Sequence, residues 1–112
     1  MNETDRRATT QLIELALGET EIGKKQEILL KITNREMPVT QYERVWFELG
    51  MLYYGQGKKE QAENCFMQVV SNGRVYRETP EEEERYDALV DICLSEQMTE
   101  VIEKREKRLN LE

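Results

Sequence analysis

Few residues of this chain could do chemistry, and the densest group is the run of four carboxylates Glu81–Glu84. Such a run could ligate a divalent cation, but consecutive residues of a helix point in different directions. Thr79 and Pro80 come directly before it, which is the pattern of a helix start with carboxylates at the positive end of the helix dipole. We therefore interpret the run as a helix cap and expect neither a metal ion nor another cofactor.

Other candidates for catalysis are equally weak. The chain has no histidine, the commonest general base and metal ligand. Cys65 and Cys93 form no C-x-x-C pair and fall at apolar positions of helical patterns, so we expect buried thiols and no disulfide. Gly55-Gln56-Gly57 is a hairpin turn without a strand before it, not a phosphate-binding loop. We expect that the protein is not an enzyme.

The composition is typical of helices with solvated outer faces. Of the 112 residues, 35% are charged and 38% hydrophobic, with two prolines and six glycines. This predicts a single all-α domain spanning residues 1–112.

The net charge of −7 argues against nucleic acid and anionic membranes as partners. The basic run Lys104–Arg108 fits the last turns of a terminal helix. No segment resembles a signal peptide or a membrane span, so we expect a cytoplasmic protein.

The elements that would position any binding site repeat along the chain. Gly23-Lys24-Lys25 recurs as Gly57-Lys58-Lys59, and the same shift of 34 residues carries Leu15 to Leu49. A period of about 34 residues is the spacing of one helix–turn–helix repeat. The sequence therefore predicts stacked helix pairs.

Local signals place the boundaries of these helices. Thr40 and Glu43 fit a capping box, and Ser71-Asn72-Gly73 suits a left-handed cap at the end of the returning helix. Thr79-Pro80 starts a third hairpin, which turns near Ser95-Glu96-Gln97. We expect six helices in three antiparallel pairs.

The middle of the chain also carries a specific motif. Trp46-Phe47-Glu48-Leu49-Gly50-Met51-Leu52-Tyr53 fits W-x2-L-G-x2-Y, and Ala62 and Phe66 fit the A-x3-F that follows. This segment resembles a tetratricopeptide repeat. Trp46 and Tyr53 share one helix face with Gly50, which lets two helix backbones approach closely, so we interpret these aromatic residues as core.

The resemblance covers almost the whole chain. It is strong in residues 43–76 and weaker in 9–42 and in 83–112, where the shift is 40. It implies three antiparallel helix pairs stacked as a short right-handed superhelix of the tetratricopeptide type.

In the repeats that this chain resembles, the first helix of each pair lines a concave groove. The residues that would face the groove form a second stripe on each first helix. Each of them follows a residue of the stripe that packs within the pair, and so lies about 100° further around the helix. This stripe is apolar in the first two pairs and acidic in the third. The predicted groove consists of Ile13, Leu17, Arg44, Phe47, Met51, Tyr54, Glu84, Asp87, Asp91 and Leu94.

An exposed apolar strip of this kind marks an interaction site, and methionine and aromatic residues suit adaptable contacts. We therefore expect a non-catalytic module, adaptor or chaperone-like, that binds a hydrophobic or amphipathic segment of a protein partner with basic residues at one end. Arg44 is the one cation near the predicted groove, which disfavours a clamp for a C-terminal carboxylate. Changing Phe47 and Met51 to Glu is expected to abolish capture. The alternative is self-association, in which a second copy fills the same face.

Overall fold

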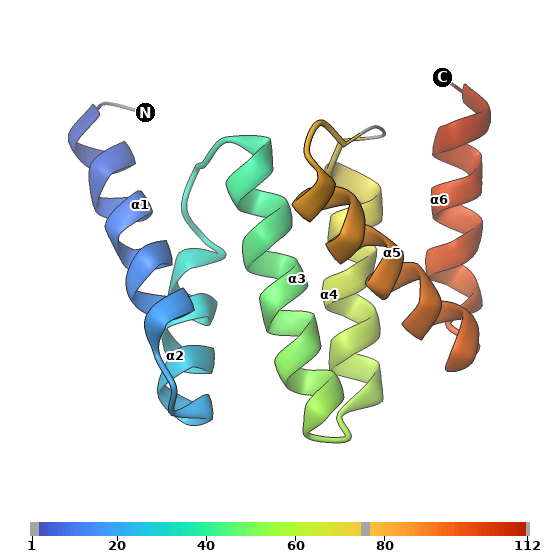
Figure 1. Ribbon diagram of the computed structural model, residues 1–112, viewed down its shortest axis with the longest axis horizontal. Helices are drawn as coiled ribbons and strands as arrows, with labels where there is room; N and C mark the ends of the chain where they lie inside the picture. Colours follow the sequence, from blue (N-terminus) through green and yellow to red (C-terminus); the bar gives the residue numbers. More distant parts are fainter. Residues whose placement is uncertain (1–2, 75–76, 112) are drawn as a thin grey trace.

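In a computed structural model, residues 3–74 and 77–111 are described, and they form six α-helices in three consecutive antiparallel pairs (Figure 1). No strand occurs in these residues, so the predicted all-α fold is confirmed. None of the six helices is both long and apolar enough to cross a bilayer. Right-handed stacking of the tetratricopeptide type stays a prediction. The helices are α1 (Glu3–Gly18), α2 (Ile22–Ile32), α3 (Val39–Gly55), α4 (Lys59–Asn72), α5 (Pro80–Ser95) and α6 (Thr99–Leu111).

The third pair begins and turns where the sequence predicts. Thr79 is the N-cap of α5, its hydroxyl accepts a hydrogen bond from the Glu82 N–H at 3.2 Å, and Pro80 is the first helical residue. The turn into α6 contains Gln97, which has a φ of 59°. Gly57 has a φ of 75° in the turn between α3 and α4, a conformation that glycine adopts without strain.

The capping interactions predicted for two helix ends are wrong. α3 begins at Val39 after Pro38, with no side-chain cap, so Thr40 and Glu43 do not form a capping box. At the end of α4, Gly73 is extended rather than left-handed, with φ −78° and ψ −179°. Glu43 approaches Gly73 instead of capping its own helix, and a Cβ added to Gly73 would lie 2.8 Å from the Glu43 Cγ.

The structural repeat of the first two pairs differs from the shift of 34 residues. α1 ends at Gly18 and α3 at Gly55, which is 37 residues later. Gly23 lies inside α2, whereas Gly57 lies in a turn, so the matching Gly-Lys-Lys segments are not equivalent in space. Leu15 is 57% exposed although its supposed counterpart Leu49 is buried. With the correct shift of 37 residues, Thr10, Glu14 and Leu17 align with Phe47, Met51 and Tyr54, which form the second stripe of α3. Ile13 does not align with this stripe.

The core consists of two clusters joined by aromatic side chains of α3. One cluster comes from the first two pairs, and the other comes mainly from α4, α5 and α6. Trp46 and Tyr53 pack against both clusters, which confirms their predicted packing role. The buried residues of the first cluster are Ile13, Ala16, Leu29, Ile32, Val45, Leu49 and Cys65, and those of the second are Ala62, Phe66, Val69, Val70, Leu89, Cys93, Met98 and Val101.

The contact between α3 and α4 has the geometry that the motif predicts. Phe66 and Ala62 are fully buried. A Cβ added to Gly50 would lie 2.6 Å from a ring carbon of Phe66 and 3.2 Å from the Cβ of Cys65. The absence of a side chain at Gly50 therefore sets how closely the two helices approach.

The last helix packs against α4, on the side away from α3 (Figure 1). Not all of the basic residues of α6 are exposed. Arg108 is half-buried, and its guanidinium donates hydrogen bonds to the carbonyl oxygens of Val70 and Gly73 at 2.8 and 2.7 Å. This cation satisfies the negative end of α4 and so ties α6 to the second pair.

Cys65 and Cys93 are free and buried, as predicted. Removal from water raises the pKa of each thiol from its ordinary value of 9.0 to about 12. Because the native state holds these protons more tightly, this contribution to stability is complete below pH 9 and is lost as the pH rises toward 12. At neutral pH both thiols should resist a thiol reagent in the native protein and react after unfolding in urea. Equal rates in the two states would contradict this burial.

Candidate partner-binding face

The second stripe of α3 lies between solvent and the core. Phe47, Met51 and Tyr54 are all half-buried, and each packs against the second core cluster. The Tyr54 hydroxyl donates a hydrogen bond to the Glu96 Oε1 at 2.9 Å, and this interaction raises the pKa of Tyr54. These side chains are therefore fixed in position while part of each surface faces water.

One of the two apolar residues that the sequence predicted for the groove on α1 is buried in the core. Ile13 is only 6% exposed and belongs to the first core cluster, because the shift of 37 residues aligns it with Gly50 on the packing face. Leu17 is half-buried against the same cluster, in register with Tyr54. Thr10 takes the place of Phe47, and its hydroxyl accepts a hydrogen bond from Gln41 of α3 at 3.1 Å. The first pair thus offers a largely polar surface here.

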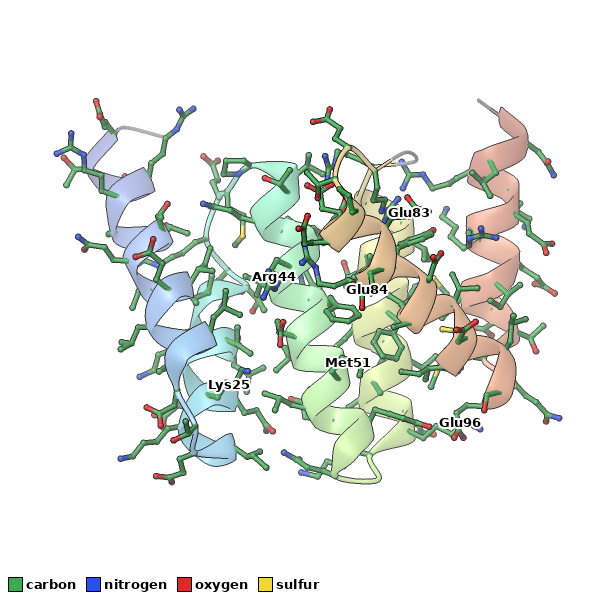
Figure 2. All side chains as sticks on the ribbon, in the orientation of Figure 1. Lys25, Arg44, Met51, Glu83, Glu84 and Glu96 are labelled. Atoms are coloured by element: carbon green, nitrogen blue, oxygen red, sulfur yellow. The ribbon has the colours of Figure 1, made fainter. Side chains whose placement is uncertain are left out.

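The predicted acidic residues of α5 are at the surface. Glu84, Asp87 and Asp91 are exposed, and Leu94 at the end of the same helix is 60% exposed. Figure 2 shows Glu84 on α5, and Arg44 and Met51 on α3, on the side of the molecule that faces the reader. The face between these helices combines partly exposed apolar groups with carboxylates. We call it the α3–α5 face and define it by Phe47, Met51, Tyr54, Glu84, Asp87, Asp91 and Leu94.

Arg44 is held by a neighbouring carboxylate of its own helix. Its Nε donates to the Glu48 Oε1 at 3.0 Å, and the Lys25 Nζ of α2 lies 3.6 Å from the Glu48 Oε2. Lys25 and Glu48 are largely buried, whereas Arg44 retains about a third of its side-chain exposure. Glu48 therefore pairs with two cations at once and joins the first pair to α3.

The structure adds a cleft that the groove prediction missed. It lies between the first turns of α3 and α5, with the last part of α4 beneath, and contains about 310 Å³ of space, which includes open solvent at its mouth. Among its lining residues, only Arg44 and Phe47 had been predicted to belong to the site. The lining consists of Thr40, Glu43, Arg44, Phe47, Val69, Arg74, Arg77, Glu82, Arg85, Tyr86 and Leu89.

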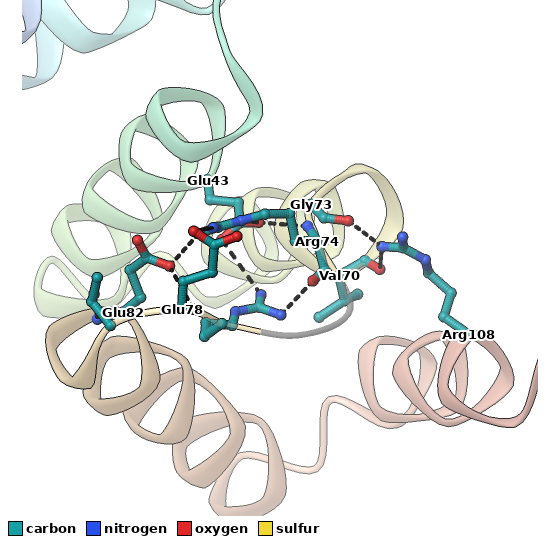
Figure 3. A network of polar contacts seen from close by, with 9 residues as sticks. Glu43, Val70, Gly73, Arg74, Glu78, Glu82 and Arg108 are labelled. Atoms are coloured by element: carbon teal, nitrogen blue, oxygen red, sulfur yellow. Dashed lines mark hydrogen bonds and ion pairs between the residues drawn. The ribbon is translucent and has the colours of Figure 1, made fainter. Parts of the chain in front are cut away.

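One wall of this cleft is a network of ion pairs (Figure 3). Glu43 accepts hydrogen bonds from both the backbone N–H and the side chain of Arg74, and its Oε2 lies 3.6 Å from a guanidinium nitrogen of Arg77. Arg74 also pairs with Glu82 of α5. The network thus joins α3, the segment after α4, and the first turn of α5.

Electrostatics in the network favour the charged forms of Glu82 and Arg74. Partial burial opposes the charge of Glu82, but the hydrogen bond from Arg74 outweighs it, so the pKa of Glu82 is lowered. Burial likewise opposes the charge of Arg74, and its bonds to Glu82 and Glu43 raise its pKa nonetheless. Arginines and glutamates recur every three or four residues from Arg74 to Arg85, which is the sequence signal that could have indicated this network.

No protein-family model, curated protein or solved structure matches this chain.

Proposed function

We propose that this protein is a non-catalytic protein–protein interaction module of the cytoplasm, adaptor or chaperone-like. Its α3–α5 face binds a hydrophobic or amphipathic segment of a partner that carries basic residues at one end. The observation that supports this proposal is the pairing of fixed, partly exposed apolar side chains on α3 with exposed carboxylates on α5. The motif that resembles a tetratricopeptide repeat supports the same reading, since first helices line the groove in that family.

The chemistry of the face determines the partner. Met51 and the ring of Phe47 offer a polarizable apolar surface that adapts to different side chains. Asp87 and Asp91 carry formal charges that attract lysine and arginine, and such charges at the rim govern the rate and specificity of association. The absence of histidine from the sequence supports a binding role rather than catalysis.

Half-burial of Phe47 and Met51 changes the choice of test. Glutamate at these positions would lower stability as well as binding, because both side chains pack against the core. We therefore choose the double variant Asp87→Lys/Asp91→Lys, whose side chains are exposed. It should fold normally by circular dichroism and lose a partner that the wild type captures from native cell extract, because two attractive charges become repulsive.

Glu103→Lys/Glu106→Lys is the matched control, since it makes the same change of charge at exposed positions of α6. It should capture the partner as the wild type does. Equal capture by all three proteins would contradict the proposal, and so would equal loss in both variants. Self-association through the same face stays the alternative. A molecular mass that rises with concentration for the wild type but not for the α5 variant would favour it.

A further inference from the structure

The cleft reverses the charge balance of the chain. The whole sequence has 16 Lys and Arg against 23 Asp and Glu, whereas four arginines and two glutamates line the cleft. An acidic protein that gathers guanidinium groups around one small space creates a local site for anions.

Two of the four arginines are matched by carboxylates. Arg74 pairs with Glu43 and Glu82, and Arg77 lies 3.6 Å from Glu43. Arg77 also stacks over the ring of Tyr86, with its guanidinium carbon 3.5 Å from the ring centre. These two arginines therefore form the wall of the cleft and fix the aromatic ring beside it.

The other two arginines retain positive charge that no neighbour fully compensates. Arg44 shares Glu48 with Lys25. Arg85 makes no hydrogen bond or ion pair within residues 3–74 and 77–111, and feels Glu82, Glu48 and Glu81 only at longer range. Burial lowers the pKa of Arg85, and repulsion by Arg44 lowers it further. Because a guanidinium stays protonated in proteins, an anion near Arg44 and Arg85 would relieve this repulsion.

The remaining lining limits the size and character of the ligand. Phe47 and Tyr86, both half-buried, contribute apolar surface, and Thr40 contributes a hydroxyl. The cleft encloses only about 20 Å³ and is otherwise open to solvent, so it suits no more than a single small group.

We propose that this cleft is a binding site for a phosphate group, with Arg44 and Arg85 as its two ligands. Each guanidinium presents a planar fork of N–H donors that matches two phosphate oxygens. A dianion fits better than a carboxylate because two cations require compensation. The ligand is either free phosphate or a phosphate ester whose organic part contacts Phe47 and Tyr86. This inference does not depend on the proposed function, since the chain alone should bind phosphate.

The test is a titration of the isolated protein with inorganic phosphate at constant ionic strength, followed by calorimetry and by NMR of the arginine side chains. We expect saturable binding with the largest shifts at the Nε signals of Arg44 and Arg85. Arg85→Gln should weaken binding by about ten-fold or more, because it removes a charge-assisted bidentate contact. Arg7→Gln is the control at an exposed arginine of α1 and should bind as the wild type does.

Titrations with other anions identify the ligand and its source. Sulfate should compete with phosphate, and acetate at the same concentration should not. Phenyl phosphate should bind more tightly than inorganic phosphate if the natural ligand is an ester, and equally if it is free phosphate.

Equal affinity of Arg85→Gln and the wild type for phosphate, equal binding of acetate and phosphate, or chemical-shift changes spread over the surface lysines would overturn the proposal. Arg85→Lys, which keeps the charge, should retain part of the affinity and guards against a folding defect. The variant Asp87→Lys/Asp91→Lys should still bind phosphate, and adding Arg85→Gln to it should weaken that binding. The proposed function and the phosphate site can therefore fail separately.

Discussion

Replacing Phe66 with alanine is expected to lower the free energy of unfolding by about 3–5 kcal/mol, the range for removing a buried aromatic side chain. Phe66 is fully buried and fills the space above Gly50, where α3 and α4 approach most closely. Urea unfolding followed by circular dichroism measures the loss. A decrease of about 1 kcal/mol, the average for point mutations in general, would contradict this role.

A double mutant tests the contact itself. Gly50→Ala alone gains about 1 kcal/mol of helix propensity but must displace the Phe66 ring, and overpacking of this kind costs about 1–3 kcal/mol. In the Phe66→Ala background the added methyl group has room, so Gly50→Ala should then stabilise the protein. If the two changes are additive, Gly50 and Phe66 are not coupled.

The second large effect is expected at Glu43. Its replacement by alanine should lower the free energy of unfolding by about 3 kcal/mol, as for other buried ion pairs that lose one partner. Glu43 is 8% exposed and accepts hydrogen bonds from the backbone and side chain of Arg74. Its loss removes a carboxylate from the wall of the cleft and from the neighbourhood of Arg77, whose side chain is almost fully buried. Thermal and urea unfolding measure the change.

Glu43→Gln separates the contribution of charge from that of the hydrogen bond. The amide oxygen still accepts from the Arg74 N–H, so this variant should lose less stability than Glu43→Ala. Glu14→Ala, at an exposed position of α1, is the control and should change stability by no more than about 0.5 kcal/mol. An equally small change in Glu43→Ala would show that the network does not hold α5 against α3.

The sequence predicted those parts of the fold that depend on local chemistry. The helix start at Thr79 was identified because a hydroxyl, a proline and carboxylates act within one turn. Gly50 and Phe66 were identified because they fit the motif W-x2-L-G-x2-Y and the A-x3-F that follows it, and Phe66 does lie against Gly50. These signals need no knowledge of distant residues.

Predictions that depended on distant contacts were less successful. Glu43 looked like a capping residue, but its carboxylate is buried against Arg74, which is 31 residues away. Ile13 was assigned to the groove because two Gly-Lys-Lys segments fixed the repeat at 34 residues, although one lies in a helix and the other in a turn. Long, flexible lysine side chains constrain register weakly, whereas the buried Leu29 and Phe66 give the correct shift of 37. The cleft was missed since its arginines come from three separate segments.

The central claim is that a partner segment binds across α3 and α5. It is tested most directly by selecting peptides from a random display library on the wild-type protein and mapping the best binder by NMR. We predict peptides that combine apolar residues with lysine or arginine at one end, and chemical-shift changes centred on Met51, Asp87 and Asp91. The absence of enriched peptides would contradict the claim, as would shifts centred on the exposed Leu15 and Ile22 of the first pair.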